Sequence, residues 1–266
     1  ALLILPAALT GCGGEFALTV PEQVGPPGAA LPVVVRLQRY ELPFILQSVE
    51  EAPMRLQIAD GVQRAAYTDE LGYAGTTLAA PEQAGRHSLR VAMQNQWGEE
   101  AAADVPVYVW EEDSEVVAVD FDSLPTSSDR TLGDARRALL ALETKGHILY
   151  LTRHPTHRTD DLRAEIARCA YPDGPVLVWR RTNRYFARSG PLRAPQIVVE
   201  ARMVRHIDSL KESFPNLRRG VCALPSSAEA FARAGILPVI VDQDGSPRAE
   251  ARQYPSWAAL ADALQR

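Results

Sequence analysis

The sequence predicts an α/β protein in which a parallel-sheet domain follows an all-β sandwich. From residue 116 onward, runs rich in β-branched residues alternate with amphipathic helix patterns, which is typical of parallel strands joined by crossover helices. From residue 16 to residue 110, short alternating strands are separated by Gly and Pro turns, which is typical of an antiparallel sandwich. We therefore expect domains at residues 13–112 and 116–266.

Composition narrows the class of protein. The length of 266 residues allows two modest domains, and the net charge of -5 argues against a general nucleic-acid binder. Three cysteines are too few for a disulfide framework. Cys169 and Cys222 are either small buried residues or, in an exported protein, a disulfide pair.

The first twelve residues suggest a membrane anchor. The apolar run Ala1–Leu9 leads into Leu9-Thr10-Gly11-Cys12, which resembles the lipobox of bacterial lipoproteins. The resemblance implies that residues 1–12 end a signal peptide and that Cys12 is lipidated. The protein would then be anchored to a membrane of the bacterial cell envelope, on its periplasmic or extracytoplasmic side. The alternative is a short buried strand followed by a Gly-rich turn.

The region from residue 13 to residue 112 carries no catalytic constellation. Its expected strands are Phe16–Val20, Leu31–Leu37, Met54–Ile58, His87–Met93 and Val105–Val109. The segment Thr68–Pro81, with Ala84–His87, resembles bacterial immunoglobulin-like domains, which implies a spacer or binding module. The acidic run Glu111–Glu115 is a short linker, so we expect the two domains to be separable there.

The strand expected at Val116–Asp122 is the centre of the second domain. Its apolar residues suit a strand buried on both faces, and its carboxylates fall at the C-terminal end, where open α/β sheets bind ligands. On a strand, Asp120 and Asp122 would point the same way and could converge on one centre. The alternative is an ordinary strand end followed by a polar turn.

The remaining elements complete an alternating pattern of strands and helices. We expect helices at Thr131–Leu142, Thr159–Arg168, Glu200–Phe214 and Ser256–Leu264, and strands at His147–Thr152, Pro175–Trp179, Gly220–Ala223 and Leu237–Asp242. The basic segment Arg180–Arg188, with interleaved aromatics, is either a contact to an anionic headgroup or a solvated loop.

Two motifs in this domain carry a family resemblance. Asp120-Phe121-Asp122, followed by Leu151-Thr152-Arg153-His154-Pro155, resembles the first two motifs of the haloacid dehalogenase (HAD) phosphatases. The nearest branch is the phosphatidate phosphatase domain of the lipins and its relative in the Nir proteins. Ser128-Asp129 and the turn Tyr171–Pro175 are similar to further features of that branch. The resemblance covers residues 116–246 and implies a HAD-like, Rossmann-type parallel sheet.

The resemblance also implies roles for individual residues. Asp120 would be the nucleophile that forms an aspartyl-phosphate, and Asp122 the general acid and base. Mg²⁺ would lie against Asp120 and Asp122, with Ser227 at the position of a further ligand. The residues that would bind phosphate are Thr152, Ser123, Arg153 and Arg202.

Three departures weaken the catalytic interpretation. The family usually has Gly-Thr after the second aspartate, where this chain has Ser123-Leu124. Met203 stands where a lysine is expected, with Arg202 beside it. Ser226 and Ser227 stand where the family has an acidic residue, and Glu229 is a poor substitute because Ser226–Glu229 has the spacing of a capping box.

Two functional hypotheses follow. The first is a degenerate HAD-like domain that binds a phosphate or a phospholipid headgroup, with weak or absent catalysis. The alternative is an active Mg²⁺-dependent phosphomonoester hydrolase that acts on a lipid phosphate. A third interpretation is an envelope protein in which the immunoglobulin-like domain performs the function.

Overall fold

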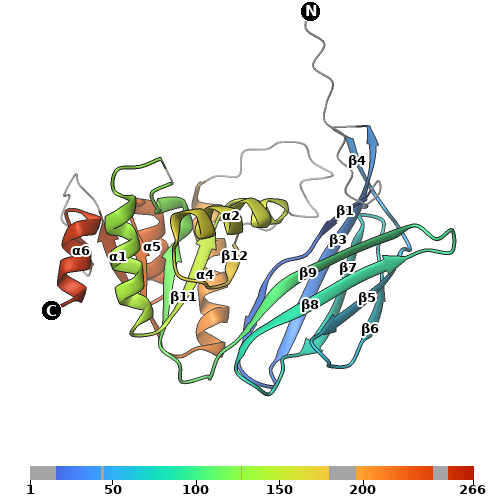
Figure 1. Ribbon diagram of the computed structural model, residues 1–266, viewed down its shortest axis with the longest axis horizontal. Helices are drawn as coiled ribbons and strands as arrows, with labels where there is room; N and C mark the ends of the chain where they lie inside the picture. Colours follow the sequence, from blue (N-terminus) through green and yellow to red (C-terminus); the bar gives the residue numbers. More distant parts are fainter. Residues whose placement is uncertain (1–15, 43–44, 127, 180–195, 242–250) are drawn as a thin grey trace, which may run out of the picture.

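The computed structural model describes residues 16–42, 45–126, 128–179, 196–241 and 251–266. It contains one part built of packed β-sheets and one part in which helices cover a parallel sheet (Figure 1). The predicted α/β class is therefore confirmed.

The first part consists of two sheets with an apolar core between them. In one sheet, β3 (Ala30–Leu42) pairs with β1 (Phe16–Thr19), β4 (Ile45–Ser48) and β7 (Tyr73–Ala79). The other sheet has the order β2 (Gln23–Gly25), β9 (Glu100–Val109), β8 (Gly85–Gln94), β5 (Pro53–Ile58) and β6 (Arg64–Tyr67). Val33, Val35 and Leu37 of β3 are fully buried, whereas Val34 is half-exposed, as the period of two along a strand requires.

The second part is a six-stranded sheet in which every neighbouring pair is parallel. Its order is β12 (Val176–Val178), β11 (His147–Thr152), β10 (Val116–Asp120), β13 (Leu217–Cys222), β14 (Leu237–Val241) and β15 (Arg252–Tyr254). The chain moves from β10 to β11 and β12, then returns to the other side of β10. The order therefore reverses between β10 and β13, and such a reversal opens a crevice at the carboxyl ends of the strands.

Helices cover both faces of this sheet. One face is packed by α1 (Leu132–Glu143), α2 (Thr159–Cys169) and α6 (Trp257–Leu264), and the other by α4 (Gln196–Ser213) and α5 (Pro225–Arg233). Cys169 and Cys222 are buried in separate apolar clusters on opposite faces. Their thiols do not face each other, which supports the interpretation as small buried residues.

The two parts meet through a packed junction. Trp110, just after β9, is buried among the apolar residues of α4, and its ring stacks on His147 at a centroid distance of 4.5 Å. Glu22, between β1 and β2, forms an ion pair with Arg163 of α2 and accepts a hydrogen bond from the backbone N–H of Val176 at 2.7 Å. The junction thus involves more than the short acidic linker, and separability at that linker stays a prediction.

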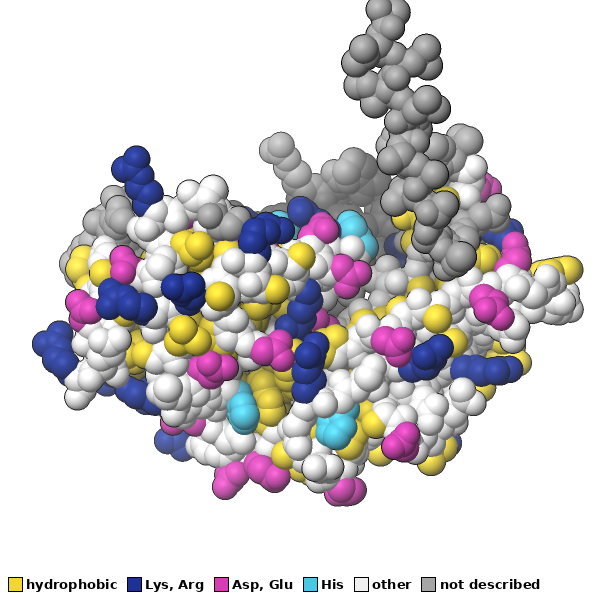
Figure 2. Space-filling model, in the orientation of Figure 1, with side chains coloured by type: hydrophobic (Ala, Val, Ile, Leu, Met, Phe, Trp, Pro, Cys, Tyr) yellow, Lys and Arg dark blue, Asp and Glu magenta, His cyan; other side chains and the backbone are white. Residues whose placement is uncertain are grey.

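Two of the predicted features are not part of the described structure. Cys12 and the basic segment 180–188 lie outside the described residues. Among the described helices, none combines the length and the hydropathy needed to cross a bilayer. On the face drawn in Figure 2, Lys and Arg side chains are interspersed with Asp and Glu over both parts of the molecule.

Candidate functional site

Asp120 is the last residue of β10 and lies at the point where the strand order reverses. All five residues of β10 are buried, and Asp120 itself is 1% exposed. The chain then enters a 3₁₀ turn, η1 (Phe121–Ser123), and the Asp120 carboxylate caps this turn by accepting a hydrogen bond from the Asp122 N–H at 3.2 Å. Asp122 is therefore not on the strand. The prediction that both aspartates point the same way as strand residues is wrong.

The Asp120 carboxylate is enclosed by neutral donors. The Ser123 hydroxyl donates to its Oδ2 atom at 2.5 Å, and the Ser227 hydroxyl lies close enough to lower the pKa of Asp120. Burial raises the pKa of Asp120, and the two hydroxyls oppose this increase. The charge of Asp122 raises the pKa further. Charge on Asp120 is thus disfavoured by its position.

The serines connect β10 to the start of α5. Ser227 is buried in the first turn of α5, and the Ser123 hydroxyl accepts a hydrogen bond from the Leu224 N–H at 3.3 Å. The predicted capping box from Ser226 to Glu229 is wrong. Pro225 is the first helical residue, so the preceding Leu224 is the N-cap, and no side chain caps the helix. Glu229 instead pairs with Arg233 at the exposed end of α5.

Asp122 faces the carboxyl end of β11. Its carboxylate accepts hydrogen bonds from the Thr152 hydroxyl at 2.8 Å and from the Arg153 backbone N–H at 3.0 Å. The Arg153 Nε and the His154 Nε2 each lie 3.4 Å from it. The Asp122 side chain is 4% exposed, whereas those of Arg153 and His154 are 58% and 39% exposed. Asp122 thus anchors two cationic or ionisable groups at the surface.

Thr152 and His154 lie at and just after the end of β11, beside Asp122. Thr152 is fully buried and its hydroxyl donates to Asp122, so phosphate binding by this hydroxyl would require it to exchange that contact. His154 lies within the predicted second motif, but the sequence does not predict a role for it, because a lone histidine after a strand carries no spacing signal. The N–H of His154 also donates to the Thr152 hydroxyl at 3.1 Å.

The predicted arginine of α4 is not brought to the aspartates. Arg202 forms no hydrogen bond or ion pair with any described residue, including Asp120 and Asp122. Its neighbour Met203 is 2% exposed and packs in the apolar cluster of α4, α5 and the sheet. The residue at the position of the family's lysine is therefore part of the core.

The described side chains do not fit a Mg²⁺ site as they are placed. Among the described residues, no three His, Cys, Asp or Glu side chains gather into a metal-binding group. Asp120 is surrounded by two serine hydroxyls and a backbone N–H, and Asp122 is turned toward β11. A hard dication requires several anionic or carbonyl oxygens, and Ser227 supplies only a neutral hydroxyl.

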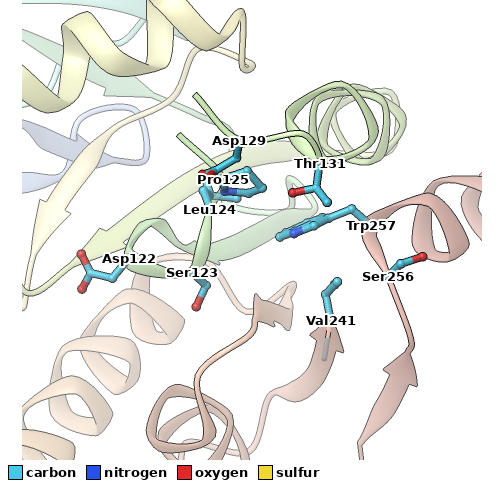
Figure 3. Close-up of a pocket in the computed structure, with 9 residues that line it drawn as sticks. All are labelled: Asp122, Ser123, Leu124, Pro125, Asp129, Thr131, Val241, Ser256 and Trp257. Carbon is cyan, nitrogen blue, oxygen red and sulfur yellow. The ribbon is translucent and has the colours of Figure 1, made fainter. Parts of the chain in front are cut away.

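A cavity of about 330 Å³ lies beside these residues. It is lined by the turn after β10, the loop that leads into α1, the end of β14 and the start of α6. Figure 3 shows that the carboxylate of Asp122 points away from the other labelled side chains. The cavity is therefore next to the Asp122 cluster and is not centred on it.

Comparisons with known proteins give only remote likenesses. No protein-family model matches the chain. No curated protein matches it either. Among solved structures, it is similar to a carbohydrate acetylesterase from Xanthomonas citri, with a TM-score of 0.38 and 12% identity over 93% of this chain and 74% of that one. It is also similar to a family 39 glycoside hydrolase from Bacteroides cellulosilyticus, with a TM-score of 0.26 and 6% identity over 84% of this chain and 50% of that one. TM-scores this low support no inference about shared fold or activity.

Proposed function

We propose that this chain joins an immunoglobulin-like domain to a HAD-like domain, and that the latter binds a phosphate group with weak or absent catalysis. Support for the HAD-like assignment is the motif Asp120-Phe121-Asp122 at the end of the central strand β10, with Thr152 at the end of the adjacent β11. Support for the immunoglobulin-like assignment is the pair of packed sheets, in which most neighbouring strands are antiparallel.

The observation that carries the binding proposal is the Asp122 cluster. Asp122 is buried and holds Arg153 and His154 at the carboxyl edge of the sheet. The Nε of the Arg153 guanidinium lies 3.4 Å from Asp122, and its two terminal nitrogens donate no hydrogen bond to a described residue, so they are available as donors. Two terminal guanidinium nitrogens that are available in this way can donate to two oxygens of a phosphate group.

The environment of Asp120 is the reason to expect weak catalysis. A nucleophile must be ionised and accessible, whereas Asp120 is 1% exposed and burial raises its pKa. Both carboxylate oxygens already accept hydrogen bonds, one from the Asp122 N–H and one from Ser123. Phosphoryl transfer would require Asp120 to exchange these contacts for the substrate.

The alternative is an active Mg²⁺-dependent phosphomonoester hydrolase. The observation that favours it is the position of Asp120 and Thr152 on adjacent parallel strands, at the edge where such sheets bind ligands. This mechanism would need Asp120 to leave Ser123 and Ser227 and to bind the metal. Mg²⁺ would then offset the charge of the incoming phosphate.

Calorimetry with Arg153→Gln tests the binding proposal. We expect inorganic phosphate to bind the unchanged protein and Arg153→Gln to weaken this binding at least about tenfold, because one charge-assisted contact is lost. Arg168→Gln is the matched control, since Arg168 is 57% exposed but lies at the far end of α2. Equal binding by the unchanged protein and Arg153→Gln would overturn the proposal. Vesicles with and without phosphatidate would then separate a lipid headgroup from free phosphate as the source.

Turnover distinguishes the two functions. We expect slow or undetectable hydrolysis of phosphatidate and of an aryl phosphate at millimolar Mg²⁺. Brisk Mg²⁺-dependent hydrolysis that disappears in Asp120→Asn would establish the hydrolase instead.

We also propose that Cys12 anchors the protein to a membrane of the cell envelope, on its periplasmic or extracytoplasmic side. The support is the lipobox-like run that ends at Cys12. In cells that express Cys12→Ser, the protein should move from the membrane fraction to the soluble fraction. Unchanged membrane association would contradict the anchor.

A further inference from the structure

We propose that the cavity beside Asp122 and Ser123 is a second ligand site, which binds a single neutral ring bearing hydroxyl groups, such as one sugar unit. This site goes beyond the phosphate-binding function and does not depend on it. The Asp122 carboxylate, which holds Arg153 and His154, points away from the cavity (Figure 3). The two sites therefore lie on different sides of the same turn.

The size and the walls of the cavity suit a ligand with one ring. A volume of about 330 Å³ is at the lower end of the range for small-molecule sites. Leu124, Pro125 and Val241 supply apolar walls, and the indole of Trp257 extends across the space between Thr131 and Val241 (Figure 3). An apolar ring face can pack on this indole, whereas a pair of acyl chains cannot enter.

Two donors inside the cavity have no acceptor among the described residues. Trp257 is only 6% exposed, and none of the described side chains or carbonyls accepts a hydrogen bond from its indole N–H. The Thr131 hydroxyl likewise forms no hydrogen bond with a described residue. Both donors reach solvent, so a ligand with hydroxyl oxygens would replace water as their acceptor.

The charges around the cavity favour a neutral ligand. Among the described residues, no Lys, Arg or His lines it, so an anion would face Asp129 without a compensating cation. Asp129 already accepts two hydrogen bonds at its Oδ2 from Thr126, which leaves its other oxygen available for a ligand hydroxyl. An ammonium group would suit Asp129 but has no acceptor to offer Trp257 and Thr131. Only a hydroxylated ring both accepts from these donors and donates to the carboxylate.

Ligand-observed NMR with methyl glucoside tests the site, with cyclohexanol as the apolar ring and tetramethylammonium as the cation. We expect methyl glucoside to bind better than either, and at least about fivefold more weakly in Thr131→Val and in Trp257→Phe. Thr131→Val preserves shape, and Trp257→Phe keeps an aromatic ring in the core while removing the N–H. Trp97→Phe is the control, because Trp97 is 76% exposed in the hairpin between β8 and β9.

Each other result would overturn the proposal. Absence of methyl glucoside binding to the unchanged protein would remove the site, and equal binding of cyclohexanol would make it a plain apolar cavity. Stronger binding of tetramethylammonium would replace the neutral ring with a cation. Binding that both substitutions leave unchanged would place the ligand elsewhere. Because every probe lacks phosphate, failure here leaves the Arg153 test unaffected.

Discussion

Two buried acids in this molecule have opposite surroundings. Glu22 lies at the junction between the two parts, and Asp120 lies at the carboxyl edge of the parallel sheet. Burial raises the pKa of both carboxyl groups. Glu22 meets the guanidinium of Arg163, which opposes the increase through hydrogen bonds and charge. Among the described residues, the groups that oppose the increase at Asp120 are hydroxyls and a backbone N–H.

The difference separates a structural carboxylate from a candidate functional one. A buried charge with a matched partner contributes to a defined contact between two surfaces, and removing one partner is costly. When a buried carboxylate has only neutral donors, they offset only part of the cost of removing its charge from water. Such carboxylates are typical of sites that are retained for chemistry or binding. The following predictions test whether Glu22 and Asp120 differ in this way.

The largest effect should follow removal of the whole first part. A chain that begins at Ser114 lacks Trp110, whose ring packs on His147 and Phe214, and it also lacks Glu22. Loss of a buried tryptophan alone costs about 3–5 kcal/mol. We expect such a chain to fold cooperatively but to unfold at much lower denaturant than one that begins at Phe16. Equal unfolding midpoints of the α/β part in both chains would show that the junction contributes nothing.

Removing the charge of Glu22 should have the next largest effect. Glu22→Gln leaves Arg163 partly buried without its anionic partner, so we expect the free energy of unfolding to fall by about 3 kcal/mol. Glu99→Gln is the control, because the ion pair of Glu99 with Arg39 is about one-third exposed and should contribute less than about 1 kcal/mol. Adding Arg163→Met to Glu22→Gln should recover much of the loss. Chemical denaturation measures all four proteins, and equal losses at the two pairs would contradict the comparison.

A second carboxylate beside Asp120 should destabilise the protein unless a metal binds. Ser227→Asp places like charges together in a buried site, so we expect a loss of about 2 kcal/mol in the presence of a chelator. Millimolar Mg²⁺ should recover stability and raise any phosphatase turnover, since a ligand of the native state stabilises it. Ser226→Asp, one residue earlier in α5, is the control and should show neither effect. A Mg²⁺ response of equal size in both variants would place the metal elsewhere.

The smallest effect should be a gain in stability. Because burial raises the pKa of Asp120 in the folded state, its contribution to stability is complete at acid pH and is lost as pH rises through that pKa. Asp120→Asn removes this loss. We therefore expect the free energy of unfolding of the variant to exceed that of the unchanged protein by on the order of 1 kcal/mol at pH 7. The difference should shrink toward pH 4. Thermal denaturation across this range measures it, and a variant less stable at pH 7 would show that Asp120 is a structural carboxylate like Glu22.

Much of the parallel sheet could be predicted from residue patterns. The runs before Asp120 and Thr152 are apolar and continuous, because strands buried on both faces have no polar side to alternate with. Strand β15 (Arg252–Tyr254) was missed, since a three-residue polar edge strand has no hydrophobic period. The closing helix and its cap were predicted, and the Ser256 hydroxyl does accept from the Ala259 N–H at 3.2 Å.

The geometry of the candidate site is harder to predict from the sequence. The resemblance placed Ser227 beside Asp120, and the influence of Ser227 on the pKa of Asp120 agrees with that placement. The opposite directions of Asp120 and Asp122 could not be predicted, because periodicity does not show where a strand gives way to a 3₁₀ turn. The sequence does not predict the role of Glu22. Its partner Arg163 is 141 residues away along the chain, and no local pattern joins them.

That long separation has a consequence for the order of events during synthesis. Glu22 leaves the ribosome early, but Arg163 and the N–H of Val176 follow 141 and 154 residues later. At ordinary translation rates this is a delay of roughly 7 to 30 seconds. The first sheets can pair during that time, while the Glu22 carboxylate stays hydrated. The nascent chain therefore completes its N-terminal segment only after most of the second part has emerged, so a chain arrested before Arg163 exposes an unfinished surface.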